Sequence, residues 1–314
     1  MKKIFQAGAL AAAFLIAGGM SGMAVKSYAG PVYSPEQYPE GVLRTMTLSM
    51  SSTERLAWYL DETGRTPDET IRQAQEGTNE EIAALLNVGG EIERWVTQAD
   101  NNDYYLTHNA WRGEDVNGAV FFDSRCCYFP QDDHVILHGH NMKGGAVFGA
   151  LNNYRDLNYL RNHPLITLRT LEGESVYAIY AVTDVNVDIN ADNYFPEIRW
   201  SFDPDGFRIY TGYLIDHSYF TVPVDLVYGD RLLTLSTCSY VYSDSRLLIC
   251  ARKLRGSETP EEMAGLIAAS EDSGVGLDDT KFVYAGGGDY ETLLPESDAG
   301  AEQGDFAEII IDPE

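Results

Sequence analysis

The sequence predicts a mainly β fold, a barrel or a sandwich, with helices before it and one helix inserted between strands. From residue 104 onward, seven or eight short runs of β-branched and aromatic residues alternate with turn residues, as in all-β domains. Residues 52–100 instead contain amphipathic segments of helical type. Residues 232–251 form two strand-like runs around a polar turn. The net charge of −26 argues against nucleic acid as a partner.

Residues 1–29 are predicted to be a secretion signal or a membrane anchor. Lys2 and Lys3 precede an uncharged stretch rich in Ala, Leu, Ile, Met and Gly over residues 4–25. Such a stretch could span a bilayer as a tilted helix, and Ala29 is also a small residue of the kind found at signal-peptidase sites. In either case the positive-inside rule places the later residues outside the membrane. We therefore expect the protein on the extracellular face of the cell membrane. Residues 1–29 would serve either as a single N-terminal anchor or as a secretion signal that is cleaved off.

Residues 30–99 are predicted to be a linker followed by helices. Three prolines mark residues 30–50 as linker. Helices are expected over 53–60, from Pro67 onward, where proline and acids occupy a first turn, and over 78–86, where Thr78 could act as the cap.

The β region is predicted to extend over residues 100–256. A short helix is expected over residues 144–154 and another over 204–217. The tail, 257–314, is expected to be disordered, because residues 258–314 hold 16 acidic residues and one lysine, a net charge of −15. The strand-like runs are 104–106, 119–122, 135–137, 165–168, 176–187, 222–227 and the two arms of the hairpin over 232–251.

The hairpin contains the residues with the clearest chemistry. Its first strand ends at Cys238, a polar turn follows over residues 243–245, and Arg246 begins the second strand. A hairpin would bring the thiol and the guanidinium to one rim of a sheet. A fixed cation there lowers the pKa of a thiol and can stabilise an oxyanion.

Cys238 is the reactive candidate among four cysteines. Cys126 and Cys127 are adjacent in sequence, and neighbouring cysteines rarely bridge each other because the bond would be strained. Cys250 lies inside a strand-like run, where a cysteine usually serves as a small buried hydrophobe.

A histidine at a strand end is the candidate base. His138 and His140 flank Gly139 directly after the apolar run 135–137, and His140 is expected to partner Cys238. The spacing of His134, His138 and His140 could also suit a metal ion. However, His134 precedes the strand and no nearby carboxylate or cysteine completes a site, so we expect no metal and no cofactor.

Taken together, these segments resemble the class B sortases, the cysteine transpeptidases of Gram-positive cell surfaces. The resemblance runs from about residue 101 to 255. It is carried by DNNDYYLTHN at 100–109, HGHNMKGGAVFGALNNY at 138–154, and TLSTC followed by an arginine eight residues after the cysteine. The sequence departs from the family at His138, where tyrosine is common, at the Cys126–Cys127 pair, and in its acidic tail.

The resemblance implies a closed eight-stranded sortase barrel with N-terminal helices and a helix inserted before the TLSTC strand. It implies that Cys238 is the nucleophile, His140 the general acid and base, and Arg246 the cation that orients substrate and stabilises the oxyanion. Thr237 and Ser239 flank the nucleophile and could donate a hydroxyl or backbone N–H to the oxyanion.

The implied partners are a peptide and an amine. Cys238 would attack the threonine carbonyl of a C-terminal sorting signal on an exported protein, and an amine of peptidoglycan would resolve the thioester. Three alternatives stay open: a pilin-polymerising sortase, another extracellular cysteine peptidase or L,D-transpeptidase, and a non-catalytic surface binding module. The last predicts that Cys238→Ala leaves function unchanged.

Overall fold

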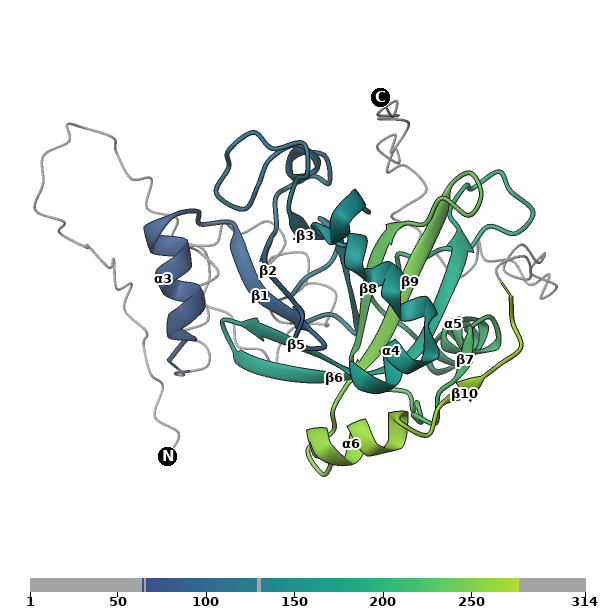
Figure 1. The fold of residues 1–314 in the computed structure, drawn as a ribbon. Helices are drawn as coiled ribbons and strands as arrows, with labels where there is room; N and C mark the ends of the chain where they lie inside the picture. Colours follow the sequence, from purple (N-terminus) through teal and green to yellow (C-terminus); the bar gives the residue numbers. More distant parts are fainter. Residues whose placement is uncertain (1–63, 65, 129–130, 277–314) are drawn as a thin grey trace, which may run out of the picture.

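The computed structural model describes Gly64, residues 66–128 and residues 131–276, and these form a closed eight-stranded barrel (Figure 1). The strand order around the barrel is β1-β2-β3-β4-β8-β9-β6-β5. This confirms the mainly β prediction and the closed barrel. The strands are β1 (Ile82–Val88), β2 (Ile92–Thr97), β3 (Val120–Phe122), β4 (His134–His138), β5 (Leu165–Thr170), β6 (Gly173–Asn186), β8 (Leu232–Cys238) and β9 (Ser245–Lys253).

Helices cover the outside of the barrel. The α-helices of the described residues are α3 (Glu69–Gly77), α4 (Leu157–Asn162), α5 (Pro204–Asp216) and α6 (Pro260–Ile267). Helix α3 packs against β1, and α5 and α6 pack against β6 (Figure 1). The barrel interior is filled by aliphatic and aromatic side chains from all eight strands, whose burial supplies most of the stability of such a fold.

Two helix predictions are confirmed, and each helix has an identifiable start. Asp68 caps α3 by accepting hydrogen bonds from the backbone N–H groups of Thr70 and Ile71. Asp203 accepts from the N–H of Gly206, and Pro204 occupies the first turn of the inserted helix α5, as helix starts favour.

The helix predicted over residues 78–86 is wrong, because residues 82–86 belong to β1 and residues 78–81 form the turn before it. Gly89 and Gly90, both with positive φ (61° and 81°), turn the chain back into β2. Strand β1 then pairs with β2 on one side and β5 on the other. The pairing with these two strands stabilises the extended conformation more than the helical preference of Ala and Leu disfavours it. The barrel therefore begins at Ile82, before the predicted boundary at residue 100.

Two predicted strands are also absent. Residues 104–106 form the 3₁₀ helix η2 (Tyr104–Leu106), inside a long connection between β2 and β3. Residues 222–227 have no strand. Pro223 lacks the N–H that a ladder needs, and only the preceding β7 (Phe220–Thr221) pairs, with β10 (Glu271–Asp272). The helix predicted over 144–154 appears as two 3₁₀ helices, η3 (Lys143–Gly145) and η4 (Gly149–Arg155).

The segment after Gly256 is not disordered as far as residue 276. Helix α6 begins with a capping box, in which Thr259 and Glu262 bond to each other's backbone N–H groups. It buries Met263 and Ile267 in the barrel core. Disorder was predicted from the acidic composition of the whole tail, and this short amphipathic helix was therefore not predicted.

Some predictions concern residues outside the described part of the chain. They are the N-terminal signal or anchor, the linker, the helix over 53–60 and the tail beyond residue 276. Among the described residues, no helix is both long enough and apolar enough to cross a bilayer.

Candidate active site

The candidate catalytic residues lie at the ends of three neighbouring strands, β4, β8 and β9. Cys238 ends β8 and is the register partner of Arg246 near the start of β9. On the other side, β4 and β8 run parallel, with His138 beside Ser236. His140 follows His138 by two residues, as Cys238 follows Ser236, so both reach the same rim. Cys238 thus ends the strand that lies between β9, which carries the predicted cation, and β4, which leads into the predicted base.

The rim is accessible although the strands are buried. Residues 232–237 of β8 are buried, whereas Cys238, His140 and Arg246 are each partly exposed. A thiol in this position has solvent access and is still held in place by a rigid strand. Cys250, by contrast, is fully buried, and burial raises the pKa of its thiol to about 12. Only Cys238 combines exposure with a histidine and an arginine nearby, and none of the four cysteines forms a disulfide.

A backbone carbonyl orients the imidazole of His140. Its Nε2 atom lies 2.9 Å from the carbonyl oxygen of Leu106, in η2. Since a carbonyl only accepts hydrogen bonds, Nε2 carries the proton in the neutral ring. Nδ1 is then the nitrogen that can exchange a proton with a reacting group. The long β2–β3 connection therefore orients the predicted base, a role that the sequence did not suggest.

The loop after His140 is also fixed. The N–H of Phe148 donates to the carbonyl of His140 at 3.0 Å. Asn141 and Val147 form an isolated antiparallel β-bridge. Gly149 allows the loop to close, because a Cβ there would lie 2.0 Å from the carbonyl oxygen of Met142. This packing accounts for the glycine that ends the GGAVFG motif.

Two asparagines link the loop to Cys238. The side-chain N–H of Asn141 donates to the carbonyl of Cys238 at 2.6 Å, and Asn152 donates to the side-chain oxygen of Asn141 at 2.7 Å. Arg155 donates to Asn152 and forms a two-pronged ion pair with the buried Asp184 on β6. The backbone of Cys238 is therefore connected through side chains to β6, the strand on the far side of β9. Neither asparagine was predicted as a site residue, although both lie in the motif that carries the family resemblance.

The hydroxyls of Thr237 and Ser239 are hydrogen-bonded within the scaffold. The Thr237 hydroxyl donates to the carbonyl of Gly139 at 2.7 Å, which ties the ends of β4 and β8 together. The Ser239 hydroxyl donates to the Ser245 hydroxyl at 2.7 Å, and its backbone N–H donates to the Ser245 carbonyl. Both hydroxyls, and the N–H of Ser239, are occupied within the scaffold.

Arg246 is partly exposed at the rim. Its guanidinium donates to the carbonyl of Ser245 at 3.3 Å. Asp230, a conceivable neutralising partner, is instead paired with Arg255 at 2.7 Å. The nearby Tyr240 is 74% exposed, and its pKa is raised, mainly by partial burial of the phenol and further by the electrostatic effect of Cys238. Tyr240 therefore lies within electrostatic reach of Cys238.

The other two histidines of the motif have different surroundings. His138 donates from Nε2 to the fully buried Asp123 at 3.0 Å, and Arg125 pairs with the same carboxylate. Together these partners hold the pKa of Asp123 far below its usual range, although burial alone would raise it. His134 bonds through both nitrogens, to the Arg199 carbonyl and the Thr234 hydroxyl, and burial lowers its pKa to about 4.

The three histidines thus do not converge. Across residues 66–128 and 131–276, no group of three or more His, Cys, Asp or Glu side chains could hold a metal ion.

A hollow of about 470 Å³ lies beside the catalytic rim. It is bordered by the residue after His140, the two residues after Cys238, and the η3–η4 loop. Its lining is Asn141, Met142, Lys143, Gly144, Gly145, Gly149, Asn152, Ser239 and Tyr240.

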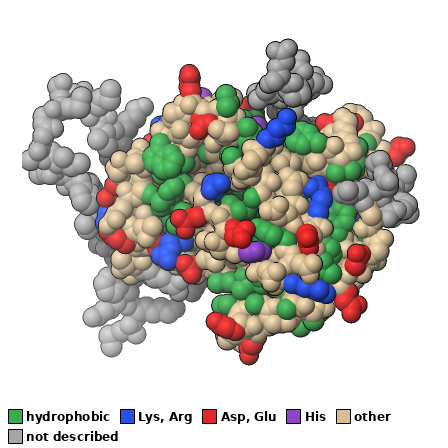
Figure 2. All heavy atoms as spheres, viewed as in Figure 1, with side chains coloured by type: hydrophobic (Ala, Val, Ile, Leu, Met, Phe, Trp, Pro, Cys, Tyr) green, Lys and Arg blue, Asp and Glu red, His purple; other side chains and the backbone are tan. Residues whose placement is uncertain are grey.

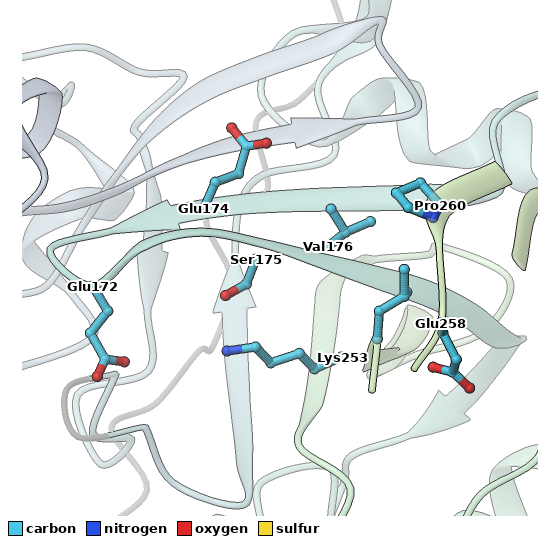
Figure 3. A pocket seen from close by; sticks show the side chains of 8 residues that line it. Glu172, Glu174, Ser175, Val176, Lys253, Glu258 and Pro260 are labelled. Atoms are coloured by element: carbon cyan, nitrogen blue, oxygen red, sulfur yellow. The ribbon is translucent and has the colours of Figure 1, made fainter. Parts of the chain in front are cut away.

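A second hollow of about 420 Å³ lies far from the rim, at the opposite end of β9 (Figure 3). There Glu172, Glu174 and Glu258 surround Lys253. Seven residues of strand, about 23 Å, separate Lys253 from Arg246. On the face seen in Figure 2, acidic side chains are scattered among basic ones, with no large basic patch.

The family model and the two curated relatives that match this chain all belong to one family. A family model described as the sortase domain matches residues 97–254. The chain is 30% identical over 188 residues to Sortase B of Listeria monocytogenes, covering 59% of this chain and 74% of that protein. It is 26% identical over 194 residues to Sortase B of Staphylococcus aureus, covering 59% and 75%.

Solved structures have the same fold. The structure of Clostridium perfringens Sortase B matches with a TM-score of 0.53 and 25% identity, over 59% of this chain and all of that one. A Staphylococcus aureus sortase B–substrate complex matches with a TM-score of 0.55 and 19% identity, over 69% of this chain and 99% of that one.

Proposed function

The chain belongs to the sortase family, with class B sortases as its relatives, and from this membership we propose that Cys238, His140 and Arg246 carry its transpeptidase chemistry. The observation that supports these roles is the strand register. Cys238 pairs with Arg246 across β8–β9, and Cys238 and His140 each lie two residues beyond the register pair Ser236 and His138 of β8 and β4. This arrangement supplies a nucleophile, a proton carrier and a cation on one rim.

In the first half-reaction, the Cys238 thiolate attacks the threonine carbonyl of a C-terminal sorting signal. Arg246 stabilises the negative charge that develops on the carbonyl oxygen. The C–N bond then breaks, and the leaving amine takes a proton from His140. The products are a thioester on Cys238 and the released C-terminal peptide.

In the second half-reaction, an amine of peptidoglycan attacks the thioester carbon. His140 accepts the proton that the amine loses, and the thiolate of Cys238 leaves. The net result is a new amide bond between the exported protein and the cell wall. The enzyme therefore acts on the cell surface, held at the membrane through its N-terminal segment.

A peptidase that only hydrolyses is the second candidate, because the same three residues would also form a thioester that water could open. Amine-dependent product formation separates the two. Pilin polymerisation differs only in the origin of the amine, a lysine of another protein.

A peptide-cleavage assay tests the proposal. A panel of fluorogenic sorting-signal peptides is incubated with residues 30–314, each peptide beside a version in which its threonine is replaced by valine. We expect cleavage after threonine in at least one peptide, abolished by Cys238→Ala and retained in Cys250→Ala. No cleavage of any peptide, or equal cleavage by Cys238→Ala, would contradict the proposed roles.

A further inference from the structure

The carbonyl that orients His140 lies in a segment with buried polar contacts of its own. Leu106 ends η2, and its carbonyl oxygen lies 2.9 Å from His140 Nε2. A carbonyl accepts a hydrogen bond from Nε2 whether or not Nδ1 carries a second proton. The contact can therefore persist through both half-reactions while Nδ1 gains and loses a proton. The position of this carbonyl decides which ring nitrogen faces the reacting groups.

Tyr105, the residue before Leu106, anchors η2. Its side chain is buried in a small hydrophobic cluster separate from the main core. Its hydroxyl accepts from the side-chain N–H of Asn79 at 2.7 Å and donates to the Glu81 carboxylate at 2.5 Å. Burial and the hydrogen bond to Glu81 both raise the pKa of the phenol, so the hydroxyl keeps its proton and remains a donor. Polar partners as well as packing therefore fix the position of η2.

The partners of this tyrosine come from outside the region that matches the family model. Asn79 and Glu81 lie between α3 and β1, whereas the model matches residues 97–254. Asn79 also donates to the carbonyl of Ala110 at 3.0 Å, and Glu81 pairs with Arg112 at 2.9 Å. The turn before β1 thus holds the β2–β3 connection at η2 and in the loop that follows it.

Gly118 lies directly against the same carbonyl. Its φ is 62°, and a Cβ placed there would lie 2.4 Å from the carbonyl oxygen of Tyr105 and 2.8 Å from that of Leu106. Both obstructing atoms belong to the backbone, so a side chain at this position would displace the carbonyl that contacts His140. The N–H of Ala119 donates to the Tyr105 carbonyl at 2.9 Å and holds the two segments together. The position of the Leu106 carbonyl therefore requires glycine at residue 118.

We propose that Tyr105 and Gly118 are positioning residues of the transfer reaction. Tyr105 fixes η2, and Gly118 leaves room for the Leu106 carbonyl. That carbonyl keeps the proton of the neutral His140 ring on Nε2 and directs Nδ1 toward the amine. The inference rests on the proposed function and adds two residues that act on His140 through Leu106.

Peptide-cleavage kinetics of two variants test the assignment. Tyr105→Phe removes the hydroxyl and keeps the ring, whereas Gly118→Ala puts a methyl group against the Leu106 carbonyl. We expect kcat to fall about three- to tenfold in Tyr105→Phe and about ten- to a hundredfold in Gly118→Ala. KM should stay within about twofold of wild type, because a displaced proton carrier slows bond breaking and leaves peptide binding intact. Urea unfolding shows that each variant is folded under the assay conditions.

Each variant has a matched control. Tyr177→Phe removes another buried phenol, which donates to Gln131 at 3.1 Å, beside Lys253 at the end of β9 far from the rim. Gly90→Ala introduces the same backbone strain, since Gly90 has a φ of 81°, but a Cβ there would meet none of the described atoms within 4 Å. Both controls should keep the wild-type kcat.

The ring nitrogens of His140 give a readout that a loss of stability alone does not change. Histidine-selective ¹⁵N labelling and a long-range nitrogen–proton spectrum distinguish a proton on Nε2 from one on Nδ1. The variant His140→Gln assigns the signals. At a pH at which the spectrum shows a neutral ring, wild type and both controls should carry the proton on Nε2. Tyr105→Phe and Gly118→Ala should show the two tautomers in exchange.

Wild-type kcat in either folded variant would overturn the role of that residue, as would an unchanged His140 spectrum. Equal losses in the controls would also overturn the inference, because they would reduce the effect to general destabilisation. If Gly118→Ala does not fold, Tyr105→Phe decides alone. Absence of cleavage by the wild-type enzyme would instead contradict the proposed function. The His140 spectrum needs no substrate, so it would still decide whether Tyr105 and Gly118 set the tautomer.

Discussion

Cys238 and Arg246 are register partners across the β8–β9 hairpin, although eight positions separate them in the chain. Adjacent strands bring directly opposed residues within about 5 Å at their Cα atoms. His140 lies two residues beyond the end of β4, the parallel neighbour of β8. The order of strands therefore brings the three residues to one rim, and the contact with Leu106 orients the imidazole.

The two histidines that flank Gly139 should differ completely in function. His140→Gln should lower the rate of peptide cleavage by at least about a hundredfold, because the proton carrier is lost. His138→Gln should keep most of the activity, since a glutamine amide can still donate to the buried Asp123. Steady-state cleavage rates of the matched variants give the comparison. Equal losses in both would mean that His138 also takes part in the chemistry.

Arg246 should act through its position as well as its charge. Arg246→Ala should lower kcat/KM about a hundredfold, as for the loss of an oxyanion donor, and Arg246→Lys should recover only part of it, because an ammonium lacks the planar guanidinium fork. Arg208→Ala, at an exposed arginine of α5, is the control. Wild-type kcat/KM in Arg246→Ala would remove this residue from the mechanism.

The asparagine link should matter more for rate than for folding. Asn141→Ala removes the hydrogen bond to the carbonyl of Cys238 and one of the two acceptors of the Asn152 amide, which keeps the carbonyl of Gly149. We expect a free-energy loss of about 1–3 kcal/mol in unfolding and a fall in kcat larger than the change in KM. Urea unfolding and cleavage kinetics on the same preparation separate the two effects. A change confined to KM would instead place Asn141 in substrate binding.

His134 should make stability dependent on pH in a defined window. Its pKa is about 4 in the folded protein against 6.5 when unperturbed, so the unfolded chain binds a proton at a higher pH than the folded chain. Stability is therefore full above pH 6.5 and falls as the pH drops toward 4, by about 3 kcal/mol. His134→Asn should remove this contribution. Urea unfolding of both proteins at pH 7, 5.5 and 4.5 gives the difference, and parallel curves would contradict the assignment.

Helix α6 should be part of the folded domain. Ile267 is fully buried in the core, so Ile267→Ala should lower the free energy of unfolding by about 2–5 kcal/mol. Truncation after Gly256 should destabilise the protein further, whereas truncation after residue 276 should not. Thermal unfolding measures all three. An unchanged Tm after loss of α6 would contradict this prediction and would support a tail that contributes nothing to the folded domain.

Local patterns in the sequence were enough to predict the hairpin, α5, and the rim that carries Cys238 and Arg246. The link from Cys238 to His140 came from family motifs, because nothing local shows that β4 and β8 are parallel neighbours 100 residues apart. Strand β1 was missed because pairing with β2 and β5 overrides the helical preference of Ala and Leu. The contact of His140 with Leu106 was missed because a backbone carbonyl leaves no mark in the sequence.

The central claim is that Cys238 forms the acyl-enzyme, and mass spectrometry tests it directly. The protein is incubated with a cleavable sorting-signal peptide, quenched in acid, and digested with trypsin. Cys238 and Cys250 fall in different tryptic peptides, residues 232–246 and 247–252. We predict that the peptide of residues 232–246 gains the mass of the acyl fragment and loses it when an amine is added before quenching. An adduct on another cysteine, or cleavage with no adduct on Cys238, would contradict the account.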